Sequence, residues 1–384
     1  MRCPILLIAA LMAALTTGCM REPELHLYDE AEVEFSLPVI DLSLDVFWDY
    51  ELNYDITYDW TAEWFYGWDD TDRQIFGEMG YTEPTEFQLR RYYTASTPYA
   101  PHTMVMKDYM TGKTFRGSYE WGYWDLLVWN NVITLDGVHS LYFDETTSLD
   151  KVIAYTGEST HPSRYQAPRH TRSFYEPEPL FAAYVQGIDI SPTLEGFEYD
   201  EERGVYVRML NMELTPVTYI YLTQVILHNN HGRIAAIDGE ANLSGMASEV
   251  ELNTGVAGTE PITVYYKARM KKDCDKNGER VDIVGGRVMT FGLCNTNGSR
   301  VSRAAEVNDH ARHYMDVAMQ FNNGNDSTFV FDVTEQVRKQ YKGGIITVEL
   351  DVDTIPVPSQ SGGSGFDATV RDVEDGGSYE FEVD

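Results

Sequence analysis

Residues 217–227 read Val-Thr-Tyr-Ile-Tyr-Leu-Thr-Gln-Val-Ile-Leu, and this stretch decides the fold class of the 384-residue chain. It is rich in β-branched and aromatic residues, which fit the pleated surface of a sheet. Side chains of a strand alternate between its two faces, and here both faces are apolar. The pattern therefore predicts a central strand of a β-sandwich, covered on both sides by its own sandwich or by the next domain.

The rest of the chain also reads as β-structure. Residues 32–37 and 125–129 alternate with period two, and 115–123 do so in part. Further strands fit residues 204–214, 261–270, 280–291, 313–321, 327–333 and 345–352. Only residues 335–341 indicate a helix, with Thr334 as N-cap and Gly343-Gly344 as its end.

The best domain boundary is residues 157–181, which contain four prolines, several Arg and His residues, and no sustained alternation. Regular strands on both sides, with very little helix, predict an all-β chain of two tandem β-sandwich domains with an Ig-like Greek-key arrangement. The predicted division is a signal peptide at 1–18, an acidic tether at 19–31, an N-terminal sandwich at 32–156, a linker or long interdomain loop at 157–181, and a C-terminal sandwich at 182–384.

The N-terminus has the pattern of an export signal. Arg2 precedes an apolar run to Leu15, and small residues then lead to Gly18-Cys19. The cysteine after glycine indicates a bacterial lipoprotein signal, in which the Cys19 thiol receives a diacylglyceryl group and anchors the mature chain stably. Thr16 departs from the usual leucine three places before the cysteine. Ordinary cleavage, which would leave a secreted soluble protein, is the alternative.

The charge and the cysteine content of the chain limit the partners and the crosslinks that it can have. The formal net charge is −32, which argues against nucleic acid as a partner because phosphates require clustered Lys and Arg. Cys3 leaves with the signal, so Cys274 and Cys294 are the cysteines that remain besides Cys19. In an oxidising envelope they could form a disulfide, and two buried free thiols are the alternative.

We predict no catalytic residues, no metal site and no cofactor. Residues 273–278 begin like a calcium loop but lack the acidic twelfth ligand, so Asn277-Gly278 is interpreted as a hairpin turn. His228/His231 and His310/His313 are closely spaced, yet neither pair forms a zinc motif, so all four are interpreted as exposed loop histidines. Ser364 in the Gly-rich stretch 362–365 does not match a nucleophile motif.

A dense run of aromatic residues suggests glycan binding as a second function. Trp60, Trp64 and Trp68 lie among carboxylates and amides, and such rings can stack on sugar faces as a glycan-binding platform. The alternative is that they fill the core and the interdomain seam of the first domain, where aromatic rings supply large buried area.

Several segments carry a family resemblance. Residues 243–247 (Leu-Ser-Gly-Met-Ala), 252–255 (Leu-Asn-Thr-Gly), 331–337 (Phe-Asp-Val-Thr-Glu-Gln-Val) and 365–366 (Gly-Phe) resemble a Bacteroidales family of outer-surface lipoproteins of unknown function. These proteins are similar to the anchor and accessory subunits that are encoded with fimbrillins. The resemblance implies two transthyretin-like sandwich domains and a lipidated N-terminus that anchors the chain in the outer membrane with its folded part at the cell surface. It also implies fimbrial or other surface proteins as partners, and it gives no catalytic residues to carry over.

The resemblance also implies assembly by β-strand addition, in which a groove of one sandwich accepts an extended segment of another subunit. The last residues, 378–384, alternate after an Asp375-Gly376-Gly377 turn. The turn favours a local hairpin, so we expect an edge strand that would become a donor strand when released. The preferred function is a non-enzymatic anchor or accessory subunit of a fimbria-like structure, and a surface glycan-binding lipoprotein is the alternative.

Overall fold

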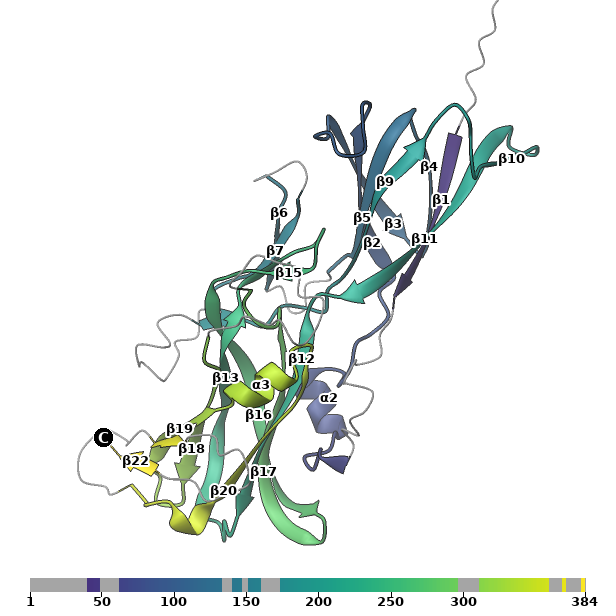
Figure 1. Ribbon diagram of the computed structural model, residues 1–384. Coiled ribbons are helices and arrows are strands. Elements are labelled where there is room, and N and C mark those ends of the chain that lie inside the picture. Colours follow the sequence, from purple (N-terminus) through teal and green to yellow (C-terminus); the bar gives the residue numbers. More distant parts are fainter. Residues whose placement is uncertain are drawn as a thin grey trace, which may run out of the picture.

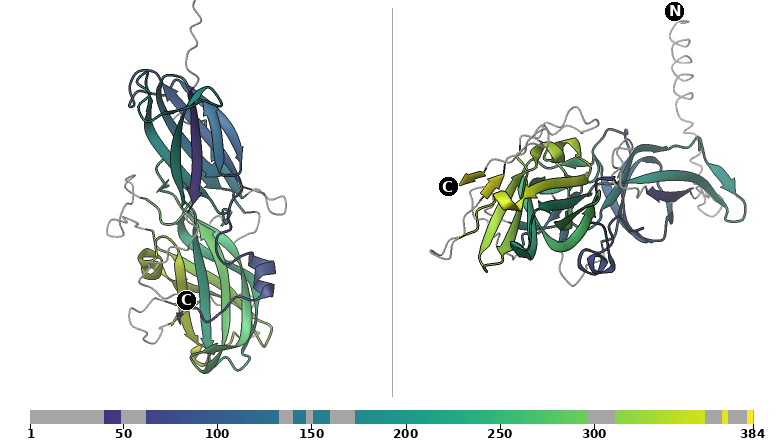
Figure 2. Two further views of the ribbon diagram at one scale, coloured as in Figure 1. Left: turned by 90° about the vertical axis from the view of Figure 1, so that its right-hand side faces the viewer. Right: turned by 90° about the horizontal axis from the view of Figure 1, so that it is seen from below.

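The structure, a computed structural model, describes residues 40–48, 62–132, 140–146, 151–159, 173–295, 311–358, 368–370 and 381–383. Strands dominate it. They form two β-sandwiches that lie end to end, with a small sheet between them (Figures 1 and 2). The predicted all-β fold with two sandwiches and little helix is confirmed.

The N-terminal sandwich has two packed layers, and among the described strands one short pairing, between a strand of each layer, joins them by hydrogen bonds. Its strands are β1 (Ile40–Trp48), β2 (Glu86–Thr94), β3 (Met104–Thr111), β4 (Thr114–Ser118), β5 (Gly122–Asn130), β9 (Phe181–Ile190), β10 (Glu198–Asp200) and β11 (Val205–Pro216). One layer is ordered β3-β2-β5-β9 and the other β10-β11-β1-β4. β9 and β11 pair only at Thr215–Ala182 and Pro216–Phe181, so the sheet divides there. Leu42, Phe87 and Trp124 pack between the layers.

The C-terminal sandwich uses longer strands. They are β8 (Ser173–Tyr175), β12 (Tyr219–His228), β13 (Ile234–Ala247), β16 (Pro261–Lys276), β17 (Glu279–Thr290), β18 (Tyr314–Phe321), β19 (Asp326–Asp332), β20 (Gly344–Asp351), β21 (Ala368–Val370) and β22 (Phe381–Val383). One layer is ordered β20-β12-β17-β16 and the other β8-β16-β13-β18-β19-β21-β22. β16 serves both layers, because its first part pairs with β13 and its second part with β17.

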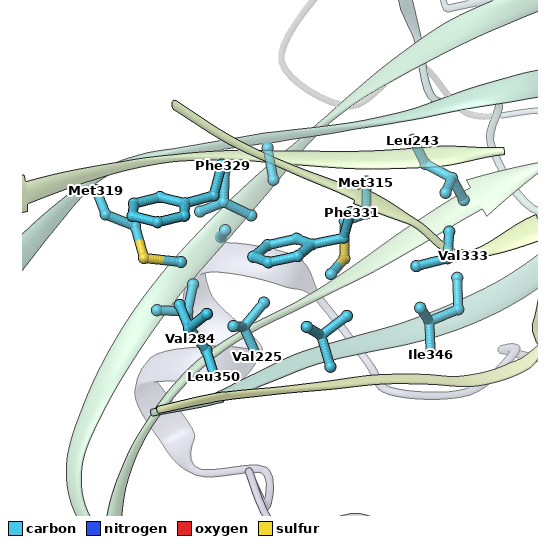
Figure 3. Packing of buried hydrophobic residues seen from close by; sticks show 14 of the residues in the cluster. Val225, Leu243, Val284, Met315, Met319, Phe329, Phe331, Val333, Ile346 and Leu350 are labelled. Carbon is cyan, nitrogen blue, oxygen red and sulfur yellow. The ribbon is translucent and has the colours of Figure 1, made fainter. Parts of the chain in front are cut away.

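Apolar side chains from both layers fill this second sandwich. Figure 3 shows Val225, Val284 and Leu350 facing Met315, Phe329 and Phe331 from the opposite layer. Two short helical elements flank the layers: α3 (Thr334–Lys339), which packs Val337 into this core, and the 3-10 turn η3 (Val352–Thr354). The predicted helix at 335–341 is therefore confirmed, with its start and end shifted by one or two residues.

A small sheet joins the two sandwiches. It is ordered β15-β14-β7-β6 and is built from β6 (Leu141–Asp144), β7 (Ile153–Thr156), β14 (Glu249–Glu251) and β15 (Val256–Ala257). Ala154 and Val250 of this sheet share one apolar cluster with Trp129 of the N-terminal sandwich and Phe291, which follows β17. The junction is thus an apolar core of its own.

The strand pairing differs from the predicted domain boundary. β8 pairs with β16 in the C-terminal sandwich, and the chain then returns to the N-terminal sandwich for β9, β10 and β11 before entering β12. Residues 182–216 were assigned to the C-terminal domain, but they complete the N-terminal one. Alternation along a strand shows which side chains are buried and does not show which sheet receives the strand.

The prediction for residues 217–227 is confirmed by β12. Tyr221, Val225 and Leu227 face the sandwich core, while Ile220, Leu222 and Ile226 belong to a second cluster on the outer face. That outer face is covered by residues 63–81, here called the strap, which contain α2 (Asp70–Phe76). Figure 1 shows α2 beside β12 and β17. The helix α2 was not predicted.

Candidate functional site

The strand β1 occupies a slot in the N-terminal sandwich. It runs parallel to β11 over nine residue pairs, from Ile40–Tyr206 to Trp48–Leu214, and antiparallel to β4 over five. All other described strand pairs of this sandwich are antiparallel. β1 precedes every other described strand, so its withdrawal would leave the pairing among the other strands of this sandwich unchanged. It would open a slot between β11 and β4.

Side chains of β1 complete the core on one face of the slot. Leu42 and Leu44 are fully buried in the cluster between the two layers. On the other face, the Asp41 carboxylate forms an ion pair with Arg203, from the turn between β10 and β11. Ser43 is paired with Met209, whose side chain is exposed. An occupant of this slot must therefore present apolar residues at alternate positions.

The C-terminal hairpin lies at the edge of the other sandwich. β21 pairs in parallel with β19 at three positions, and β22 pairs with β21 at three more. The expectation of an edge strand near the C-terminus is confirmed for residues 381–383. Among the described residues β21 pairs with β19 at three positions, and release of the hairpin would expose the hydrogen-bonding edge of β19.

The tryptophans predicted as a glycan platform do not form an open surface in the described part of the chain. Trp64 is 9% exposed and packs, with Tyr66, on the outer face of β12 and β17. Trp68 is partly buried and packs against Phe76 of α2. Trp60 lies outside the described residues. The rings cover the second sandwich, whereas the alternative interpretation had placed them in the first domain and its seam.

The possible disulfide is not formed. Cys274 and Cys294 do not pair with each other, and they belong to different apolar clusters, under the strap and at the junction respectively. The register explains the separation, because Cys274 pairs with Val281 near the turn of the β16–β17 hairpin, whereas Cys294 lies beyond the far end of β17. Cys19, the predicted lipidation site, lies outside the described residues.

The remaining candidate motifs have structural roles. Asn277 and Gly278 both have positive φ and form the predicted hairpin turn between β16 and β17. The interpretation of the histidines as exposed is wrong for His313, which is fully buried with Nδ1 at 3.2 Å from the Ser244 carbonyl oxygen. His228 is also partly covered, because it bridges Glu279 and Glu349 at 3.0 Å each.

Within the described ranges no group of three His, Cys, Asp or Glu side chains could hold a metal ion. A cavity of about 760 Å³ lies over β13, β16 and the start of β18, and its charged lining residues are Glu260 and Arg312. Among the helices of the described part, none has the length and apolar character needed to cross a membrane.

No protein-family model matches the sequence, and no curated protein matches it. Solved structures do resemble it. A candidate adhesin from Bacteroides ovatus is 13% identical, with 84% of this chain and 95% of that chain covered and a TM-score of 0.47. A candidate adhesin from Bacteroides thetaiotaomicron is 10% identical, with 82% and 92% covered and a TM-score of 0.45. The fimbrial anchor protein Mfa2 from Porphyromonas gingivalis is 8% identical, with 89% and 95% covered and a TM-score of 0.38. Likenesses at this level leave the function to be argued from the chain's own residues.

Proposed function

We propose that this chain is a non-enzymatic lipoprotein subunit of a fimbria-like cell-surface structure, and that it joins partner subunits by β-strand addition. Two features support the proposal. The N-terminal sequence predicts an export signal at residues 1–18, followed by Cys19, which would attach the mature chain to the outer membrane. The strand β1 lies in a slot between β11 and β4 from which it can leave without breaking another connection.

The observation that carries the proposal is the pairing of β1. An empty slot would present the backbone N–H and C=O groups of β11 and β4, which only another extended strand can satisfy together. It would also leave the two core positions of Leu42 and Leu44 unfilled. Burial of each leucine-sized side chain contributes about 1.5–3 kcal/mol, so an incoming strand with apolar residues at alternate positions would be held firmly.

The C-terminal segment of such a subunit has the pattern of a donor. Tyr379, Phe381 and Val383 alternate with acidic residues, matching the alternation that the slot requires. In the folded chain β22 is paired only with β21. Release of a hairpin that pairs with β19 at three positions costs little free energy. β1, by contrast, pairs with a neighbour on each of its two edges.

The experiment is to lock β1 in its slot. Ser43, which is buried, and Met209, which is exposed, are register partners on the face away from the core, so the variant Ser43→Cys with Met209→Cys places two thiols where a disulfide can cross the strands. We expect the oxidised variant on the cell surface to lose its co-purifying partner subunits, and reduction to restore them.

The matched control joins two strands without closing the slot. Tyr199 and Tyr206 are register partners on β10 and β11, and the variant Tyr199→Cys with Tyr206→Cys should retain its partners when oxidised. If the oxidised Ser43→Cys, Met209→Cys variant keeps the same partners as the wild type, strand addition at this slot is excluded.

The lipid anchor needs a separate test. Palmitate labelling of the wild type and of Cys19→Ala should give a labelled and an unlabelled protein respectively, because the Cys19 sulfur and the new N-terminus are the acylated groups. Equal labelling of both would contradict the anchor, whatever the result of the slot experiment.

A further inference from the structure

The strap connects two parts of the molecule that lie far apart in sequence. It follows β1 and precedes β2, both strands of the N-terminal sandwich, yet residues 63–81 lie on the outer face of β12 and β17 in the C-terminal sandwich. Figure 1 shows α2 on the side of the C-terminal sandwich, away from the small sheet at the junction. The sandwiches are therefore attached at two separate places.

The backbone of the strap is recognised by one buried amide. Gln224 on β12 is fully buried, and its Oε1 accepts hydrogen bonds from the backbone N–H groups of Phe65 (3.0 Å) and Tyr66 (3.3 Å). Its Nε2 donates to the carbonyl oxygen of Glu63 (2.5 Å) and to Oγ1 of Thr347 (2.9 Å). Removal of the strap would take away three of the four hydrogen bonds of this amide and expose it to water.

The sheet also contains a recess that fits one side chain of the strap. A Cβ atom added to Gly285 would lie 2.5 Å from Cδ2 and 2.7 Å from Cγ of Tyr66, so the ring occupies the space that any larger residue needs. Gly285 does not have positive φ, so the backbone conformation does not require glycine at this position. The glycine is explained by the aromatic ring that packs on it.

A charge cluster completes the contact. The Asp72 carboxylate of α2 is fully buried and accepts from Tyr66 OH (3.0 Å), Arg269 Nη1 (2.8 Å) and Lys271 Nζ (2.5 Å). Lys271 Nζ also lies 4.2 Å from the centroid of the Tyr66 ring. Burial, together with Asp72, raises the pKa of Tyr66, which keeps its hydroxyl protonated as a donor. Asp69 faces the same two cations, so the cluster holds two negative and two positive charges.

We propose that the outer face of β12 and β17 is a binding site for the aromatic and acidic strap, and that the docked strap acts as a releasable clamp that fixes the two sandwiches relative to each other. The strap adds a second attachment to the apolar junction, so its docking restricts rotation of one sandwich against the other. The proposal does not depend on strand addition and would hold for a protein with any surface function.

The features of the contact favour release without global unfolding. The seven-residue helix α2 is too short to be stable alone, so it should unfold when the strap leaves. The core between the two layers of the C-terminal sandwich remains after the strap has left, because the cluster beneath the strap is separate from it. The strap is therefore a local unit of stability.

The first test opens the clamp with Gly285→Val in the full chain. Arg73 lies in α2 with its side chain half-exposed, and trypsin can cleave after it only when the helix unfolds. We expect cleavage at Arg73 to accelerate about tenfold or more, since proteolysis follows the population of the opened segment. Small-angle X-ray scattering should show a broader range of overall dimensions than the wild type. Unchanged cleavage, or faster cleavage with unchanged scattering, would overturn the clamp.

A second test asks whether the face is a binding site, and its arm with the Asp72→Asn peptide does not depend on how well Gly285→Val folds. Tyr66→Ala weakens the strap and leaves the recess intact, so a labelled peptide of residues 62–82 should bind this full-length variant. The same peptide should bind at least about tenfold more weakly to Tyr66→Ala with Gly285→Val, and so should a peptide carrying Asp72→Asn. Equal binding of both peptides to both variants, or no binding to Tyr66→Ala, would overturn the proposal.

Discussion

The substitution Asp72→Asn probes the buried charge cluster directly. It preserves the size of the side chain and removes the negative charge that two cations share. The Arg269 and Lys271 side chains are 29% and 14% exposed, so neither can recover full hydration in the docked strap. An asparagine oxygen can accept from one of them, but its NH₂ group would then face another donor.

The magnitude follows from the burial. Removal of one partner of a buried ion pair typically costs 3–5 kcal/mol, because a buried charge is left uncompensated. Both cations keep Asp69, at 3.0 Å from Arg269 and 3.2 Å from Lys271, and both keep some contact with water. We therefore expect the low end of that range, about 3 kcal/mol, which corresponds to a change of about 100-fold in the equilibrium between docked and released strap.

The assay is hydrogen exchange of the strap amides, supported by urea unfolding. The N–H groups of Phe65, Tyr66 and Asp72 are hydrogen-bonded in the docked strap and should lose protection together. Asp70→Asn is the matched control, because the Asp70 side chain is 92% exposed and pairs only with Arg73 on the same helix. It should cost less than about 0.5 kcal/mol. If Asp72→Asn costs as little as the control, the cluster is not a buried determinant of docking.

Three further predictions concern other parts of the chain. The bidentate hydrogen bonds from Arg90 lower the pKa of Glu145 from 4.5 to about 2. Its contribution to the free energy of unfolding, roughly 1–2 kcal/mol after solvent screening, should be complete above pH 4.5 and disappear as pH falls to 2, so Glu145→Gln and wild type should converge in acid denaturation. Leu44→Ala should lower the free energy of unfolding by about 2–5 kcal/mol, measured in urea, because it opens a cavity under β1; a smaller effect would mean that this position is not packed. Cys274 and Cys294 should both be alkylated after denaturation without reductant, and mass spectrometry showing neither modified would indicate a disulfide.

The sequence predicts secondary structure correctly where the deciding pattern is local. The alternation in residues 217–227 predicted β12 with both faces covered, and Asn277-Gly278 predicted the β16–β17 turn. Thr334 and Gly343-Gly344 located the helix α3 within two residues, but Thr334 is its first residue, and the N-cap is Val333, without a side-chain cap hydrogen bond. In each case the deciding interactions lie within a few residues of one another, so they can be seen in a single window of sequence.

The strap could not be predicted, because its burial depends on residues about two hundred positions later. Tyr66 is buried by the recess at Gly285 and by the amide of Gln224, and neither is visible from the strap itself. One local signal was present: Asp69 and Asp72 form a capping box at the start of α2, an acidic variant of the usual motif. The predicted domain boundary is wrong for the same reason, because the strands that pair with β9 and β11 are set by tertiary contacts with distant parts of the chain.

The central claim is that β1 occupies a slot that another subunit's strand can fill. A photo-crosslinking residue at position 209, which lies on the outer face beside Ser43, reports what occupies that slot in the assembled surface structure. We predict crosslinked peptides that join position 209 to a different polypeptide, while the isolated monomer gives crosslinks only to residues 40–48 of its own β1. Crosslinks to its own β1 alone, in the assembled structure as in the monomer, would contradict the account.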